Sequence, residues 1–233
     1  MIKSSTIQKV FMLISLSVVF IGCTKKTTKI NFNDIDTSYN EKDGLIIESI
    51  VAKEESESFT YKIRIPKIVN SRTENNNLKE FNDEIRDYAD SIVNNLNGLV
   101  QNPKKDLKKA ILNIDYEIYH GYNIYTLIIT ATQEINDTSI TNYRSYYIRD
   151  NGNYIYNIEE IIKVEEAFPY FTQRIKEKTQ PNKLLFDLQQ AVIYFENKRV
   201  VIKFPPYVFN LDDTEYTENI FEFNEEEVKK YIK

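Results

Sequence analysis

The stretch ILNIDYEIYHGYNIYTLIITAT, residues 111–132, consists largely of β-branched and aromatic side chains. Residues of these kinds favour strands, and His120-Gly121 interrupts them at a place typical of a hairpin corner. A third run of the same character covers residues 140–149, and the turn-forming residues 150–153 lead from it into a short fourth run. We therefore predict an antiparallel meander at the centre of the fold.

The segments on either side of the meander have periods of their own. Residues 75–100 carry apolar side chains at steps of three and four residues, which predicts an amphipathic helix of about six turns. Residues 59–65 alternate between apolar and polar side chains, which predicts a half-buried strand. After the meander, residues 158–178 favour helix, residues 191–204 favour a hairpin and residues 225–232 favour a short closing helix.

This order of elements predicts the α+β class, with one or more antiparallel sheets, a long amphipathic helix packed on one face and shorter C-terminal helices. We expect the globular domain to cover residues 43–233, as one unit or as two subdomains that divide near residues 157–185. Residues 23–42 are polar and are expected to form a tether.

The N-terminus has the pattern of an export signal. Lys3 and Lys9 precede an apolar run at residues 10–21, and a small residue follows. A basic segment, a short apolar segment and a small residue before the cut are typical of a secretory signal peptide, here residues 1–22. The apolar run is too short for a membrane-spanning helix.

Residues 20–23, Phe-Ile-Gly-Cys, resemble the lipobox of bacterial lipoproteins. The resemblance implies cleavage between Gly22 and Cys23, a diacylglycerol on the Cys23 thiol and an acylated amine. It also implies a lipid-anchored protein on the periplasmic or cell-surface side of a bacterial membrane. The alternative is an uncleaved anchor in which Cys23 is an ordinary small residue.

The composition excludes several kinds of chemistry. A single cysteine and a single histidine leave no ligands for an internal disulfide, a cysteine zinc site or an iron–sulfur cluster. The chain has five glycines and contains neither a Walker-type run nor G-x-G-x-x-G. We therefore expect no cofactor and no metal. The formal charge of −5 becomes about −7 once Lys3 and Lys9 are removed, which argues against a nucleic-acid partner.

Tyrosine is the residue type most enriched around the meander. Strand alternation requires some of these side chains to point away from the core, and tyrosine is favoured at protein interfaces and on sugar-binding surfaces. The alternative is a β-rich core whose hydroxyl groups reach its solvated edges. The possible binding face comprises Tyr116, Tyr122, Tyr125, Tyr143, Tyr146 and Tyr154.

Other chemistry-bearing residues have simpler interpretations. His120 stands beside a glycine at the expected turn, with no cluster of partners in the sequence. Acidic runs occur at residues 212–215 and 225–227, and either could supply the paired carboxylates of a glycoside hydrolase. The second run also fits the first turn of a helix, where the helix dipole favours acids.

Three segments resemble a family of exported α+β domains. These domains form the ectodomain of lysozyme-sensing anti-sigma factors and the N-terminal extension of a peptidoglycan deacetylase. The similar segments are the helix at residues 78–93, the strand, turn and short helix at residues 145–162, and the strand with its proline break at residues 201–207. The chain departs from the family pattern at residues 135–139. In that family the deacetylase chemistry belongs to a separate domain, so the resemblance implies no catalytic role here.

Together these features predict a lipid-anchored envelope or surface lipoprotein that acts as a non-catalytic binding module. The expected partners are the membrane, through the N-terminal lipid, and an envelope protein, a host protein or peptidoglycan. Two alternatives stay open: a cell-wall carbohydrate hydrolase that uses paired carboxylates, and a structural envelope protein.

Overall fold

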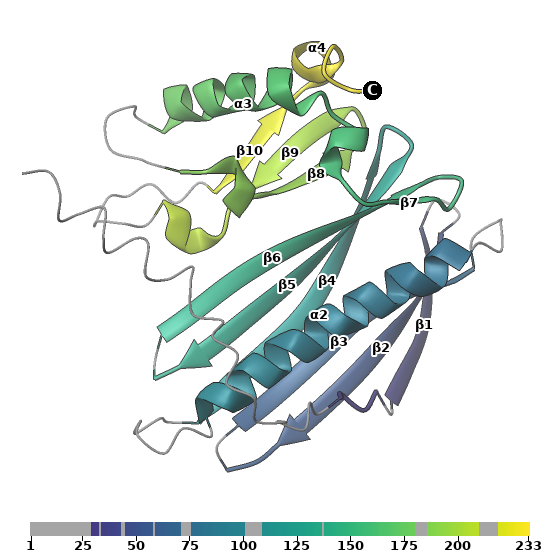
Figure 1. The fold of residues 1–233 in the computed structure, drawn as a ribbon, viewed down its shortest axis with the longest axis vertical. Helices are drawn as coiled ribbons and strands as arrows, with labels where there is room; N and C mark the ends of the chain where they lie inside the picture. The colour runs from purple at the N-terminus through teal and green to yellow at the C-terminus, as the bar shows by residue number, and fades with distance from the viewer. Residues whose placement is uncertain are drawn as a thin grey trace, which may run out of the picture.

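The fold is α+β, as predicted, and consists of two sheets with helices packed against them (Figure 1). The structure is a computed structural model, and it describes residues 29–32, 34–42, 45–57, 59–70, 76–100, 109–136, 138–179, 186–209 and 219–233. Gly22, Cys23 and the acidic run at residues 212–215 lie outside these residues. No helix in the described part of the chain is long and apolar enough to span a membrane.

The larger sheet has seven strands, and their order in the sheet is their order in the chain. All neighbouring strands are antiparallel except β3 and β4, which are parallel. A parallel pair needs a long crossover, and the helix between these two strands supplies it. The strands are β1 (Asp34–Lys42), β2 (Leu45–Glu55), β3 (Phe59–Asn70), β4 (Ala110–Gly121), β5 (Ile124–Ile135), β6 (Thr138–Arg149) and β7 (Tyr154–Ile155).

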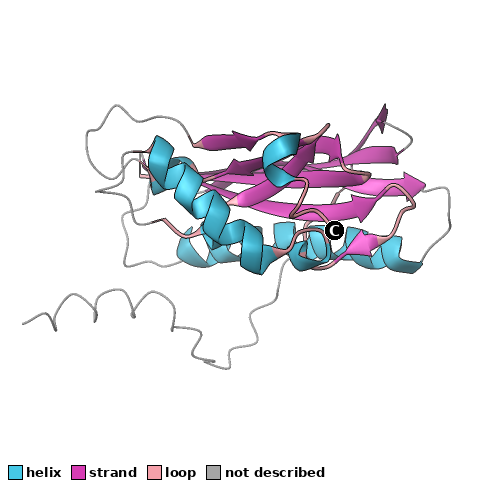
Figure 2. Cartoon of the chain, turned by 90° about the horizontal axis from the view of Figure 1, so that it is seen from above, coloured by secondary structure: helices cyan, strands magenta, loops and turns pink. Residues whose placement is uncertain are grey.

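The crossover is the predicted amphipathic helix, α2 (Asn76–Val100). Its apolar stripe, which includes Phe81, Ile85 and Leu96, is fully buried against one face of the seven-stranded sheet. Figure 2 shows α2 running along one side of the layer of strands. Every third or fourth side chain of a helix lies on the same side, so the sequence period alone selects the buried stripe.

Two predictions about boundaries were wrong. Residues 34–42, expected in the tether, form β1 and pair with β2, so the folded part begins earlier than residue 43. The hairpin corner is not His120-Gly121 but Tyr122-Asn123, which have positive φ angles of 54° and 60°. Two successive left-handed residues match the twist of a two-residue hairpin, and asparagine tolerates this conformation well.

Gly121 is needed for a different reason, which is a close approach between the two sheets. A Cβ atom at this position would lie 2.6 Å from the carbonyl oxygen of Asn197, at the tip of a second hairpin. The Asn197 amide donates a hydrogen bond of 2.7 Å to the His120 carbonyl. Glycine therefore lets the backbones of the two hairpins touch.

The second unit is a three-stranded antiparallel sheet covered by helices on one face. Its core is rich in phenylalanine, including Phe171, Phe195, Phe204, Phe221 and Phe223. Its elements are α3 (Val164–Lys178), β8 (Val192–Glu196), β9 (Arg199–Lys203), β10 (Ile220–Phe223) and α4 (Glu225–Val228), with short 3₁₀ helices η1 (Ile158–Glu160), η2 (Leu188–Gln190) and η3 (Pro206–Val208).

The two sheets meet face to face along β8. Ile128 on β5 is buried with Val192, Tyr194 and Val201 of the smaller sheet. The face of β5 and β6 that points away from α2 is thus covered at one end by the second unit. The central strands are therefore covered on both faces, by α2 on one side and by the second unit on the other. A tyrosine of the meander can be buried on either face.

Candidate functional site

Three of the six tyrosines proposed as a binding face belong to the core. Tyr116, Tyr125 and Tyr146 are each at most 6% exposed and pack in the cluster formed with α2. They lie on strand positions whose alternation directs them towards the helix, in register with Leu127 and Ile129. These three tyrosines cannot contribute to an exposed surface, and that part of the prediction was wrong.

The buried hydroxyl groups of Tyr116 and Tyr146 have different surroundings. The hydroxyl groups of Tyr116 and Ser49 share a hydrogen bond of 2.6 Å. The Tyr146 ring meets Phe81 edge to face, with ring centroids 5.8 Å apart. Burial raises the pKa of the Tyr146 phenol and keeps it neutral. Tyr116 is thus paired inside the core, and the Tyr146 hydroxyl has no hydrogen-bond partner among the described residues, so these two rings belong to the core without a solvated edge.

The other three tyrosines are partly exposed, but at separate places. Tyr122 donates a hydrogen bond of 2.9 Å from the β4–β5 turn to the Lys198 carbonyl. Tyr154 donates one of 2.6 Å to Glu84 on α2. Tyr143 lies on the opposite face of the sheet, with the Lys203 ammonium 4.6 Å from its ring centroid. The six residues therefore do not form one surface.

His120 is half-buried in β4 and not at the turn, whereas the acids of α4 lie at the start of a helix as expected. The Nε2 atom of His120 lies 2.8 Å from Oδ1 of Asp150 at the end of the meander. Residues 225–227 form the first turn of α4, which Asn224 caps. The helix-turn interpretation of this acidic run is confirmed. Within the described residues, no group of three or more potential ligand side chains is arranged to hold a metal ion.

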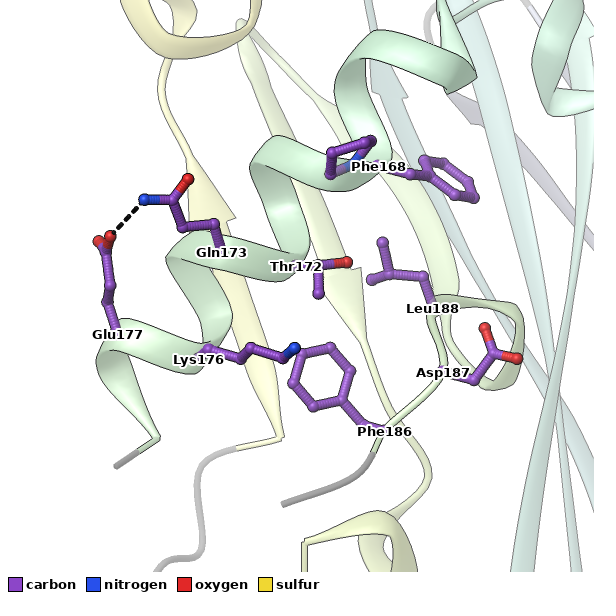
Figure 3. A pocket seen from close by; sticks show the side chains of 9 residues that line it. Phe168, Thr172, Gln173, Lys176, Glu177, Phe186, Asp187 and Leu188 are labelled. Atoms are coloured by element: carbon purple, nitrogen blue, oxygen red, sulfur yellow. Dashed lines mark hydrogen bonds between the residues drawn. The ribbon is translucent and has the colours of Figure 1, made fainter. Parts of the chain in front are cut away.

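A groove lies between α3 and the segment that leads into η2 (Figure 3). It has a volume of about 1080 Å³ and is open to solvent. This volume is at the upper end of what small-molecule sites usually offer. We define the α3 groove by its lining residues, Phe168, Pro169, Thr172, Gln173, Lys176, Glu177, Phe186, Asp187 and Leu188.

Helical spacing supplies one wall of the α3 groove. Phe168, Thr172 and Lys176 follow one another at steps of four residues, so they form one stripe along α3. Figure 3 shows Thr172 and Leu188 pointing towards each other across the groove, and Leu188 is buried. The period of the stripe was visible in the sequence, whereas the segment that faces it comes from beyond the helix.

Packing in the second core fixes the other wall. The Phe186 ring meets Phe204 edge to face at 5.4 Å and lies 5.8 Å from the ring of Phe209. The Asp187 carboxylate accepts a hydrogen bond of 2.9 Å from the Gln189 amide and so caps η2. The wall is thus held by aromatic packing on one side and a cap on the other.

The polar groups of the α3 groove lie along its rim. Gln173 donates a hydrogen bond of 3.0 Å to Glu177, which also accepts one of 2.8 Å from Arg174. In Figure 3, Glu177 and Asp187 lie at opposite sides of the groove and do not face each other. Apolar and aromatic walls with a hydroxyl, an ammonium and carboxylate groups at the rim suit a ligand with both apolar faces and hydroxyl groups.

Comparison of the chain with protein-family models and with curated proteins gives no match.

Proposed function

We propose that this protein is a bacterial envelope lipoprotein, anchored through lipid on Cys23, whose folded part is a non-catalytic binding module. The observation that carries the proposal is the α3 groove, and we propose a strand of cell-wall glycan as its ligand. The pyranose rings of such a strand have apolar C–H faces that stack on aromatic rings such as Phe168 and Phe186. Their hydroxyl groups would meet Thr172, Lys176 and Asp187 at the rim.

A binding role fits this groove better than hydrolysis does. A glycosidase needs two carboxyl groups that flank the bond to be cleaved, roughly 5 to 10 Å apart across the substrate. The Glu177 carboxylate is instead engaged with Gln173 and Arg174 on α3, and Asp187 caps η2. Each carboxylate thus has a structural role within its own element.

The ligand is tested by sedimentation of the purified protein with insoluble peptidoglycan. Thr172→Arg places a long charged side chain in the groove while keeping a good helix former on α3. It should weaken binding at least about tenfold, equivalent to roughly 1.4 kcal/mol. Thr138→Arg is the matched control, because Thr138 is exposed at the start of β6, far from α3 along the chain, and it should bind like the wild type.

Crosslinking in intact cells extends the test to protein ligands. Suppose that the wild-type protein does not sediment with peptidoglycan but is crosslinked to another protein, and that Thr172→Arg abolishes the crosslink. That other protein would then replace the glycan as the proposed ligand. If neither peptidoglycan nor a captured protein responds to Thr172→Arg, the α3 groove is not the binding site.

The anchor is tested separately by metabolic labelling. Radiolabelled palmitate should enter the wild-type protein, and Cys23→Ala should abolish both the label and retention in the membrane fraction. Two or three acyl chains anchor a protein stably, whereas one binds only marginally. Unchanged labelling in the Cys23→Ala protein would refute the lipoprotein assignment.

A further inference from the structure

Residues 29–32 lie against α2, and we call this segment the strap. The backbone amide of Ile30 donates a hydrogen bond of 2.8 Å to Oδ1 of Asp90. The guanidinium of Arg86 lies 5.1 Å from the centre of the Phe32 ring. Ile30 and Phe32 are partly buried and pack against the core of the seven-stranded sheet. Lys29, which precedes them, is exposed.

These contacts shorten the reach of the anchor. Without the strap, the tether would run from Cys23 to Asp34 at the start of β1 and could span about 40 Å, because an extended chain covers at most about 3.5 Å per residue. With the strap seated on α2, only six peptide steps separate Cys23 from Lys29, and they span at most about 20 Å. This limit holds for any conformation of the residues between them.

The two ends of the molecule then lie at different distances from the lipid. The strap is attached to α2, which packs on β3 and β4, whereas the α3 groove belongs to the second unit. Figure 1 shows α3 and the three-stranded sheet at one end of the molecule, and α2 with β1, β2 and β3 at the other. A lipid held within about 20 Å of α2 brings that end towards the bilayer.

We infer that the strap orients the anchored domain, with α2 towards the membrane and the α3 groove facing away from it, towards the cell wall. The inference rests on the proposed lipid anchor at Cys23. It assigns the strap a positioning role, because Lys29–Phe32 act through α2 and touch no ligand. Without these contacts, the domain would tumble on a longer tether and the groove would have no preferred direction.

Energy transfer in lipid nanodiscs tests the orientation. The chain has one cysteine, which the lipid occupies, so an introduced cysteine is the only free thiol for a fluorescent label. Labels at Lys79→Cys on α2 and at Glu166→Cys on α3, both exposed, are compared in the presence of acceptor-labelled lipid. We expect at least twofold more transfer from α2 than from α3. Equal transfer from the two positions would overturn the inference.

Release of the strap should remove this difference. Ile30→Ser combined with Phe32→Ser deletes its apolar contacts, and the two labels should then report similar transfer. Val69→Ser combined with Leu99→Ser is the control, since both residues are exposed apolar side chains elsewhere on the domain, and the difference between the labels should persist.

Hydrogen exchange tests the seating of the strap by itself. The Ile30 amide should be protected in the wild-type protein and should exchange at least tenfold faster with Asp90→Ala. Exchange of Ile30 at the rate of a free amide in the wild type would refute the strap. The full chain with Cys23→Ala should keep this protection, so loss of membrane retention in that variant reports on the anchor and leaves the strap measurable.

Discussion

Tyr147 connects the two sheets through a single hydroxyl group. Its ring is buried on the face of β6 opposite α2, and its hydroxyl donates a hydrogen bond of 2.8 Å to the Ile193 carbonyl on β8. The Ser145 hydroxyl lies 3.0 Å away and completes its surroundings. At the scale of the residue, the abundance of tyrosine in the meander is explained by large apolar rings whose polar ends reach a neighbouring element.

Alkaline pH should lower the free energy of unfolding, because the buried Tyr147 phenol loses its proton. Burial raises the pKa of Tyr147 from 10.0 to about 12, so the folded state holds the phenolic proton more tightly than the unfolded state. The contribution of the neutral Tyr147 phenol to the free energy of unfolding is fully present below pH 10. It is lost as the pH rises from about 10 to 12, by up to roughly 1.4 kcal/mol per pH unit for one group. Urea unfolding at a series of pH values measures this slope.

Substitution identifies the group responsible. Tyr147→Phe should lower the free energy of unfolding at neutral pH by about 1 to 2 kcal/mol, because the hydrogen bond to Ile193 is lost, and should reduce the alkaline slope by the share of one tyrosine. Tyr207→Phe is the control, since Tyr207 is exposed, and it should change stability by less than about 0.5 kcal/mol. An unchanged slope in Tyr147→Phe would show that other groups cause the alkaline loss.

At the scale of the element, α2 determines the layout of the larger sheet. It carries the chain from the end of β3 back to the start of β4, which makes this the one parallel pair among the described strands of that sheet. The helix also covers the face on which Tyr116, Tyr125 and Tyr146 lie. A single amphipathic helix therefore connects the parallel strands β3 and β4 and forms the layer that covers one face of the sheet.

Two leucines three residues apart on α2 provide a matched test of this packing. Leu96 is 0% exposed and Leu99 is 42% exposed. Leu96→Ala should destabilise the protein by about 2 to 5 kcal/mol, because it leaves a cavity beneath the helix. Leu99→Ala makes the same change in helix propensity, and it should lower the free energy of unfolding by less than about 1 kcal/mol. Thermal unfolding of both variants measures the difference, and equal losses would contradict the buried stripe.

At the scale of the whole molecule, two hydrophobic cores share the central strands. One core lies between α2 and the seven-stranded sheet, and the other lies between α3 and the three-stranded sheet. A small cluster around Ile128 and the touching backbones of Gly121 and Asn197 join the two units. The contact is face to face, so each unit covers apolar surface of the other.

The junction should be sensitive to the loss of one side chain. Ile128 is fully buried, and Ile128→Ala should lower stability by about 2 to 4 kcal/mol and should speed amide exchange in β8 and β9 before it affects α2. Ile140→Ala is the control, because Ile140 on β6 is 47% exposed. Exchange rates measured across the chain check this prediction, which fails if both variants leave β8 and β9 equally protected.

Several features could be predicted because they depend on neighbours in sequence. The three- and four-residue spacing predicted α2 to within a residue or so, and the β-branched runs predicted β4, β5 and β6. The acids at residues 225–227 were predicted as the first turn of a helix and form one. In each case the signal is local, since propensity and period act within a few turns of chain.

The α3 groove could not be predicted in this way. The stripe at Phe168, Thr172 and Lys176 has helical spacing, but the facing wall comes from residues 186–188. The position of Phe186 depends on packing against Phe204 and Phe209. The paired strand β1 was also missed, because a polar segment becomes an edge strand only when a neighbouring strand accepts it.

By itself, the sequence determined the class of the fold and the identity of its main helix and strands, and it predicted a lipid on Cys23. Only the tertiary structure decided which tyrosines are buried, where the strap lies and which elements form the groove. The physical reason is that alternation along a strand defines two faces without saying what covers either one. That choice is made by α2 on one side and by β8 on the other, and both come from distant parts of the chain.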